Sequence, residues 1–197
     1  MAIDQIHDIQ QVYRKILHSM SRPGTISVLE EAKQLDYELP CKKSTMLCAM
    51  TVLDAEVTFH ILPGNQQKLI EKISEYTSAR YAPIEEADFV IILKNASKED
   101  VLQAMRQCKI GSLIDPQLSS TWIIESEGLA EEGNLSLSGP GIESHASLHA
   151  GMPESFWKAR SSRIKEYPMG IDLIFVDDDS GIVCIPRTTR VIMTEVE

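Results

Sequence analysis

The sequence lacks both a long apolar run and a closely spaced pair of cysteines. Nowhere do about 18 or more apolar residues follow one another, the length that a membrane-spanning helix needs, and the first residues hold no apolar signal core. The four cysteines, Cys41, Cys48, Cys108 and Cys184, are widely scattered. Free thiols in a reducing cytosol explain this spacing better than a disulfide framework does. We therefore expect a cytoplasmic protein that does not enter a membrane.

Positive charge is also scarce. The chain has 19 lysines and arginines against 29 aspartates and glutamates, which gives a net charge of −10. An acidic surface repels nucleic acid and anionic lipid, so we expect neither as a partner. With 197 residues and 43% hydrophobic residues, the chain can bury one sizeable core without a metal or disulfide, and we expect one domain over residues 1–197.

The first half of the sequence alternates strands with helices. Apolar residues from Ile3 to Met20 recur with the period of a helix, which the turn sequence Ser-Arg-Pro-Gly at residues 21–24 ends. Ser44 and Ser97 are the predicted N-caps of two further helices. Another helix is expected around Leu69 and Ile73. Strands are expected at residues 26–29, 57–62 and 89–93, the last of them continuously apolar.

The second half is richer in strands. They are expected at residues 120–125, 135–138, 171–176, 181–185 and 190–193, with a hairpin turn at 177–181. A helix that opens at Pro153 carries Phe156 and Trp157, whose large side chains are suited to a core or an interface. The acidic segment 125–132 is interpreted as a solvated loop. This order predicts an α/β fold with a mixed sheet.

A rigid Gly-Pro-Gly loop follows the strand predicted at residues 135–138. Backbone amides near Gly139 and Gly141 can approach a ligand closely, as in loops that hold phosphate. The spacing matches neither a Walker loop nor a Rossmann fingerprint, so the loop taken alone is better interpreted as a structural turn.

Basic residues gather at two places near the C-terminal end of the chain. They are Lys158, Arg160, Arg163 and Lys165 in the first group, and Arg187 and Arg190 in the second. Arginines beside hydroxyls such as that of Thr188 are good partners for phosphate or phosphonate oxygens. Alternatively, the first group covers a helix face or contacts an acidic partner, and Arg187 pairs with Asp172 inside the fold.

Other candidate chemistry is weaker. His145 and His149 have the spacing of metal ligands on a helix, but glycines bracket them and only Glu143 offers a third ligand, so we expect no metal site. Ser155 and Lys158 match a Ser-x-x-Lys pattern without its companion elements, and the cysteines are not clustered for an iron–sulfur centre. The residues alone give no self-sufficient catalytic set.

Several short motifs in a fixed order carry a family resemblance. They are Tyr-Arg at 13–14, Met-Ser-Arg-Pro-Gly at 20–24, Leu-Ser-Leu-Ser-Gly-Pro-Gly-Ile at 135–142, Phe-Trp at 156–157 followed by Arg160, Tyr-Pro-Met-Gly-Ile-Asp at 167–172, and Ile-Pro-Arg-Thr-Thr at 185–189. Together they resemble the PhnH family, the H subunits of the bacterial phosphonate carbon–phosphorus lyase core complex. The resemblance runs from about residue 10 to residue 190, although residues 30–120 match only in hydrophobic pattern.

The resemblance implies a three-layer α/β/α sandwich, similar to the large domain of pyridoxal-phosphate-dependent transferases but without that cofactor. It implies a homodimer in isolation and a place in a complex with the G, I and J subunits. That complex transfers the ribose triphosphate moiety of ATP to an alkylphosphonate during phosphonate degradation. The family supplies no agreed catalytic residues for this step.

Three hypotheses follow. In the first, the chain is a partner-binding subunit that is inactive alone. In the second, it contributes directly to catalysis: the loop from Gly139 to Ile142 holds an anionic substrate near Arg187 and Thr188, with Arg22 from the first turn. The third is an unrelated pyridoxal-type enzyme, which an imine absorption band with pyridoxal phosphate would reveal.

Overall fold

The computed structural model describes residues 6–35, 38–164 and 166–194. Two predictions fall on other positions: Ile3, the expected start of the first helix, and Lys165 of the first basic group lie outside the described residues. The helices are α1 (His7–Ser21), α2 (Lys43–Val52), α3 (Gln67–Thr77), α4 (Lys98–Gln107) and α5 (Glu154–Arg163), with 3-10 turns at Glu30–Gln34 and Pro116–Leu118. The strands are β1 (Ser27–Val28), β2 (Thr58–Leu62), β3 (Arg80–Tyr81), β4 (Phe89–Ile92), β5 (Thr121–Glu125), β6 (Ala130–Ser138), β7 (Ala146–His149), β8 (Asp172–Val176), β9 (Gly181–Ile185) and β10 (Arg190–Met193).

A seven-stranded mixed sheet forms the centre of the molecule, in the order β1-β9-β8-β5-β4-β2-β3. The strands from β8 to β3 run parallel to one another, while β9 is antiparallel to both β8 and β1. The expected mixed sheet is thus confirmed. The continuously apolar segment at 89–93 forms β4, between β5 and β2, as its pattern predicts.

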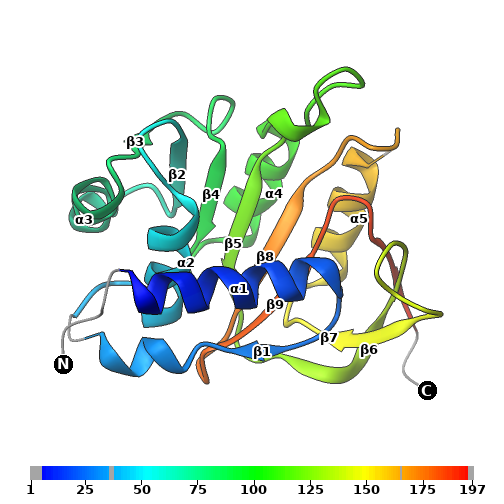
Figure 1. Cartoon of the computed structure of the whole chain (residues 1–197). Coiled ribbons are helices and arrows are strands. Elements are labelled where there is room, and N and C mark those ends of the chain that lie inside the picture. Colours follow the sequence, from blue (N-terminus) through cyan, green and yellow to red (C-terminus); the bar gives the residue numbers. More distant parts are fainter. Residues whose placement is uncertain (1–5, 36–37, 165, 195–197) are drawn as a thin grey trace.

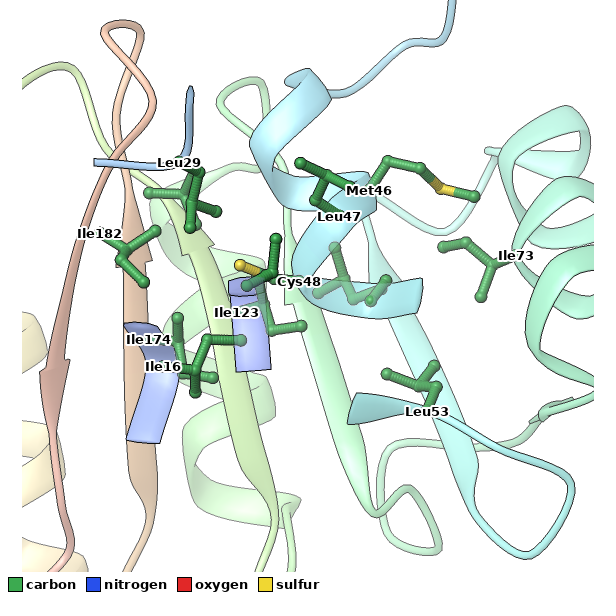
Figure 2. Close-up of a cluster of buried hydrophobic side chains, with 14 of the residues drawn as sticks. Ile16, Leu29, Met46, Leu47, Cys48, Leu53, Ile73, Ile123, Ile174 and Ile182 are labelled. Atoms are coloured by element: carbon green, nitrogen blue, oxygen red, sulfur yellow. The ribbon is translucent and has the colours of Figure 1, made fainter. Parts of the chain in front are cut away.

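Helices cover both faces of this sheet, with α1, α2 and α3 on one face and α4 and α5 on the other (Figure 1). Successive side chains of each strand point to opposite faces. Ile123 of β5 and Ile174 of β8 therefore pack with Ile16 and Cys48 from the first layer of helices (Figure 2), whereas Trp122 packs with the second layer. The result is the expected three-layer α/β/α arrangement.

A second, three-stranded antiparallel sheet lies beside the α5 layer, in the order β10-β6-β7. The strands expected at 135–138 and 190–193 belong here and not to the central sheet. Strand β7 was not predicted. Of its four residues only Leu148 is buried, so the apolar alternation that reveals a strand is absent from the sequence.

The predicted helix starts had different outcomes. Ser97 caps α4 as expected, because its hydroxyl accepts a hydrogen bond from the Asp100 amide at 3.1 Å. Ser44 was the wrong N-cap for α2: Lys42 occupies the cap position, and Ser44 is buried inside the first turn. The start of α2 is instead bound by Glu125, 80 or more residues away, which no local sequence pattern indicates.

The interpretation of residues 125–132 as a solvated loop was also wrong. Glu125 is the last residue of β5 and is buried, and β6 already begins at Ala130. Glu131 and Glu132 are exposed, but as part of that strand. Their charges are solvated, as expected of acidic residues, while the backbone of residues 130–132 is strand.

All four cysteines are free thiols. Cys48, Cys108 and Cys184 are buried, and burial raises the pKa of each thiol, that of Cys48 to about 12. Burial and the nearby Glu125 carboxylate likewise raise the pKa of Cys41 to about 12. The thiols are therefore protonated at neutral pH and behave as packing residues. In the described part of the chain, no helix is both long and apolar enough to cross a membrane.

Candidate functional site

The structure brings together the motifs that are far apart in the sequence. Gly141 has a φ of +83°, and a Cβ atom there would lie only 2.3 Å from the carbonyl oxygen of Ser21. Gly139 has a φ of +138°, and its Cβ would lie 3.0 Å from the carbonyl oxygen of Thr188. The loop at 139–141 is therefore packed between the end of α1 and the loop before β10. We call residues 21–24, 139–141 and 187–189 the glycine junction.

The turn at 21–24 is fixed by the second sheet. Gly24 has a φ of +92°, and its Cβ would lie 2.9 Å from the Cβ of Ala146 in β7 and 3.1 Å from Leu137 in β6. Glycine is required here because the backbone is left-handed and the space is filled. Three of the family motifs thus meet at one place, where the end of α1 contacts the second sheet.

Arg187 is held by the fold. Its backbone amide donates a hydrogen bond to the Asp172 carboxylate at 2.7 Å, and its guanidinium Nε lies 3.7 Å from the other oxygen of that carboxylate. Its Nη1 donates to the carbonyl of Pro116 and to the hydroxyl of Ser119. The structure therefore agrees with the interpretation in which Arg187 pairs with Asp172.

The predicted site residues meet only in part. Gly139 and Thr188 are in contact, and Gly141 lies against the turn that contains Arg22. Arg22 itself is exposed, and its guanidinium contacts the imidazole of His18 on α1.

Arg160 connects α5 to the loop between β9 and β10. It is only 1% exposed, and its guanidinium donates to the carbonyls of Thr189 at 3.2 Å and Pro186 at 2.8 Å. Burial lowers its pKa to about 10, opposed by the charge of Asp172, so Arg160 remains protonated at neutral pH. The sequence placed Arg160 in a basic cluster but gave no sign of its burial.

Two other members of the first basic group, Arg163 and Lys158, are also engaged. Arg163 donates to the carbonyl of Cys108 at 2.8 Å, and the Lys158 ammonium pairs with Glu154 at 2.6 Å. The neighbouring Ser155 hydroxyl is buried and has no hydrogen-bond partner among the described residues. The Ser-x-x-Lys pattern is therefore not assembled into a nucleophile with its base.

A cavity of about 520 Å³ lies between α5 and β10. Its lining consists of Arg160, Ser161, Ile164, Tyr167, Arg187, Thr188, Thr189, Arg190, Val191 and Ile192. None of these residues is acidic, and three are arginines. The sequence indicated the arginines of this site, but not the buried Thr189, whose hydroxyl has no hydrogen-bond partner in the part of the chain that the structure describes.

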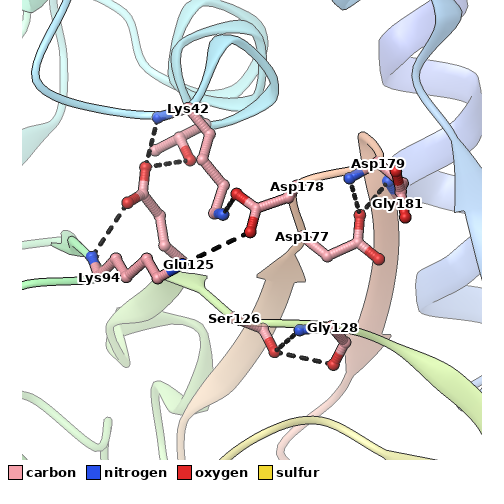
Figure 3. A network of polar contacts seen from close by, with 10 residues as sticks. Lys42, Lys94, Glu125, Ser126, Gly128, Asp177, Asp178, Asp179 and Gly181 are labelled. Atoms are coloured by element: carbon pink, nitrogen blue, oxygen red, sulfur yellow. Dashed lines mark hydrogen bonds and ion pairs between the residues drawn. The ribbon is translucent and has the colours of Figure 1, made fainter.

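A second polar cluster lies at the carboxyl ends of the parallel strands (Figure 3), the edge at which α/β folds commonly bind ligands. One oxygen of Glu125 accepts from the Lys42 amide at 2.6 Å and the Thr45 hydroxyl at 2.9 Å, and the other accepts from the Lys94 amide at 3.0 Å. The ammonium groups of Lys42 and Lys94 both reach Asp178 in the hairpin turn between β8 and β9.

This carboxyl-edge cluster connects the start of α2, the end of β5, the segment after β4 and the turn between β8 and β9. The hydrogen bond from Lys42 lowers the pKa of Asp178; burial opposes this shift, and the charges of Lys42 and Lys94 add to it. A smaller cavity of about 190 Å³ lies beside the cluster, with Lys94, Lys98 and Glu127 among its lining residues and a floor that includes Phe156. The sequence missed Glu125 because nothing local distinguishes it from the acidic residues that follow.

The two spaced histidines do not share a helix. His149 ends β7 and His145 immediately precedes it, and both are exposed. In an extended strand, positions four residues apart are separated by about 13 Å, which is too far for both imidazoles to bind one metal ion. Within the described residues, no group of three or more His, Cys, Asp or Glu is placed to hold a metal.

The family model described as "Bacterial phosphonate metabolism protein (PhnH)" matches residues 2–192. The chain belongs to the PhnH family. The glycine junction is therefore built from motifs of a PhnH chain, and the resemblance drawn from those motifs is confirmed.

Two relatives align with most of the chain. One is a "Putative C-P lyase subunit protein HtxG" from Stutzerimonas stutzeri, which is 26% identical over 187 residues, 92% of this chain and 85% of the relative. The other is an "Alpha-D-ribose 1-methylphosphonate 5-triphosphate synthase subunit PhnH" from Rhizobium meliloti (strain 1021), which is 26% identical over 190 residues, 95% of this chain and 92% of the relative.

Proposed function

We propose that this PhnH chain is a subunit of a bacterial carbon–phosphorus lyase complex, needed for transfer of the ribose triphosphate moiety of ATP to an alkylphosphonate. The observation that carries the proposal is the family match over residues 2–192. It is supported by the full-length relatives, one named as a lyase subunit and the other as a synthase subunit. The reaction would take place in the cytoplasm.

The role we assign is partner binding. Two features that could have held a substrate instead hold the fold. Arg187 is engaged by Asp172, Pro116 and Ser119, and the glycines of the loop at 139–141 pack against the backbone of residues 21 and 188. Groups engaged in this way are not available to a transferring phosphonate in the isolated subunit. Chemistry then takes place on neighbouring subunits.

Exposed apolar side chains supply a surface for those neighbours. Tyr13 and Leu17 lie four residues apart on α1 and are 52% and 54% exposed. Residues at this spacing lie side by side on a helix, and burying two such large side chains is a common basis of a stable interface. We assign this face of α1 to contacts with the G, I and J subunits, and to the homodimer when they are absent.

An activity measurement tests whether the chain is needed by the complex and inactive by itself. The complex of G, I and J subunits should transfer ribose triphosphate from ATP to methylphosphonate only when this chain is added, and the chain alone should show no turnover. Turnover by the chain alone would contradict the partner-binding role.

The catalytic alternative makes a different prediction for Arg22, which is exposed and can be replaced without a packing defect. In our proposal Arg22→Gln leaves the rate of the assembled complex within about twofold. If Arg22 touches the transferring group, the loss would be on the order of a hundredfold.

A further inference from the structure

The cavity between α5 and β10 concentrates positive charge on a chain whose net charge is −10. Its lining carries three arginines, the hydroxyls of Ser161, Tyr167, Thr188 and Thr189, and no carboxylate. A lining of one sign in an acidic protein raises the local concentration of counter-ions of the opposite sign. The cavity therefore selects for anions.

The charges of the three arginines differ in how far they are compensated. Arg187 lies beside the Asp172 carboxylate. Within the described residues, the Arg160 guanidinium donates to the carbonyls of Thr189 and Pro186, and its Nε finds no acceptor. Arg190 is exposed, and its guanidinium forms no hydrogen bond or ion pair within the described residues. Two guanidinium charges thus remain without a bound carboxylate.

The carboxyl end of α5 opposes these charges only weakly. Ser161 and Ile164 place the end of that helix in the lining, and the partial charge at a helix C-terminus is about −0.5. Two full positive charges exceed it. Burial lowers the pKa of Arg160 to about 10 although the charge of Asp172 raises it, so the guanidinium remains a buried positive charge at neutral pH.

We propose that this cavity binds the phosphoryl or phosphonyl group of a small molecule, with Arg190 and the Thr188 hydroxyl as contacts at its rim and Arg160 as the buried charge behind them. Guanidinium groups and hydroxyls match the tetrahedral oxygens of such groups. A volume of about 520 Å³ falls within the range of small-molecule sites and leaves room for more than the anionic group itself. This deepens the proposed function by placing an anion site on the subunit.

The test is calorimetric titration of the isolated chain with inorganic phosphate, methylphosphonate and ATP at low salt, with amide NMR shifts to locate binding. We expect at least one of these anions to bind, with shifts centred on residues 188–191. Arg190→Gln should weaken binding about tenfold, since it removes one charge-assisted hydrogen bond. Thr188→Val should weaken it less.

The matched control is Arg80→Gln, which removes an equally exposed arginine from β3 at the far edge of the central sheet. It should change the affinity by less than twofold. Equal weakening by both variants, or shifts spread over the whole surface, would show only a general charge effect and overturn the site.

The order of affinities for the three anions shows which small molecule carries the phosphoryl or phosphonyl group that the cavity binds. Tighter binding of methylphosphonate than of phosphate assigns the cavity to the phosphonate, whereas tighter binding of ATP assigns it to the triphosphate. No binding by any of the three overturns the proposal. If the chain assembles with its partners but binds no anion, the anion site is wrong and the proposed function stands. If the chain binds an anion but never assembles with its partners, the proposed function is wrong and the anion site stands.

Discussion

Replacing Gly141 with alanine should lower the free energy of unfolding by about 3 kcal/mol. Two costs combine at this position. The backbone has a φ of +83°, which an alanine adopts with strain, and the new Cβ would lie 2.3 Å from the carbonyl oxygen of Ser21. That oxygen belongs to the backbone at the end of α1, so it can move only if the turn at 21–24 moves with it.

Urea unfolding followed by circular dichroism measures this loss. The matched control is Gly64→Ala, because a Cβ at Gly64 would meet no atom within 4 Å and Gly64 is not among the glycines with positive φ. Its free energy of unfolding should change by less than about 1 kcal/mol. Equal effects at the two positions would show that the loop at 139–141 does not pack against residue 21.

Replacing Glu125 with alanine should cost about 3 kcal/mol as well. The Glu125 carboxylate accepts hydrogen bonds from the amides of Lys42 and Lys94 and from the hydroxyl of Thr45. Alanine would leave these donors at the start of α2 and the end of β4 without their acceptor. Leaving one buried donor unsatisfied costs about 1–3 kcal/mol, and neighbouring water offsets part of the sum.

Unfolding in urea measures the loss of stability in Glu125→Ala, and hydrogen exchange shows which backbone amides lose protection. The amides of Lys42 and Lys94 should exchange faster in the variant than in the parent. Glu127→Ala serves as the control, since this neighbouring glutamate is exposed, and should change stability by less than about 0.5 kcal/mol. A Glu125 variant as stable as the Glu127 variant would contradict the role of the carboxyl-edge cluster.

The elements that the sequence predicts well are those whose signal is local. The apolar stripe of α1, the continuous apolar run of β4 and the Asp-rich turn between β8 and β9 each contain their own evidence, because periodicity and turn chemistry act over a few residues. Phe156 and Trp157 are buried in the core, as their size suggests.

The features that were missed depend on contacts between distant parts of the chain. The acceptor at the start of α2 is Glu125 at the end of β5, and not the expected Ser44. Strand β7 forms because it pairs with β6, and its own residues lack the apolar pattern of a strand. Arg160 appeared as part of a basic surface, yet its guanidinium is buried against the carbonyls of residues 186 and 189. None of these contacts has a local sequence signal.

For the candidate site, the sequence indicated the motifs but not which contacts their residues form in the fold. The resemblance placed the Gly-Pro-Gly loop, the first turn and the Arg-Thr-Thr segment in one family pattern, and the structure brings them into contact. The Arg187 guanidinium lies beside the Asp172 carboxylate, whereas among the described residues the guanidinium groups of Arg160 and Arg190 form no ion pair with a carboxylate. Side-chain pairing of this kind follows from the packing of α5 on β10, which residue types do not reveal.

Co-expression with the G, I and J subunits from the same source tests whether this chain assembles with them. A tagged G subunit should carry this chain through affinity and size-exclusion steps as one complex of defined mass in native mass spectrometry. Leu17→Asp should abolish co-elution, whereas Gln11→Asp, on another exposed face of α1, should not. A chain that folds normally but elutes apart from all three subunits would contradict the account.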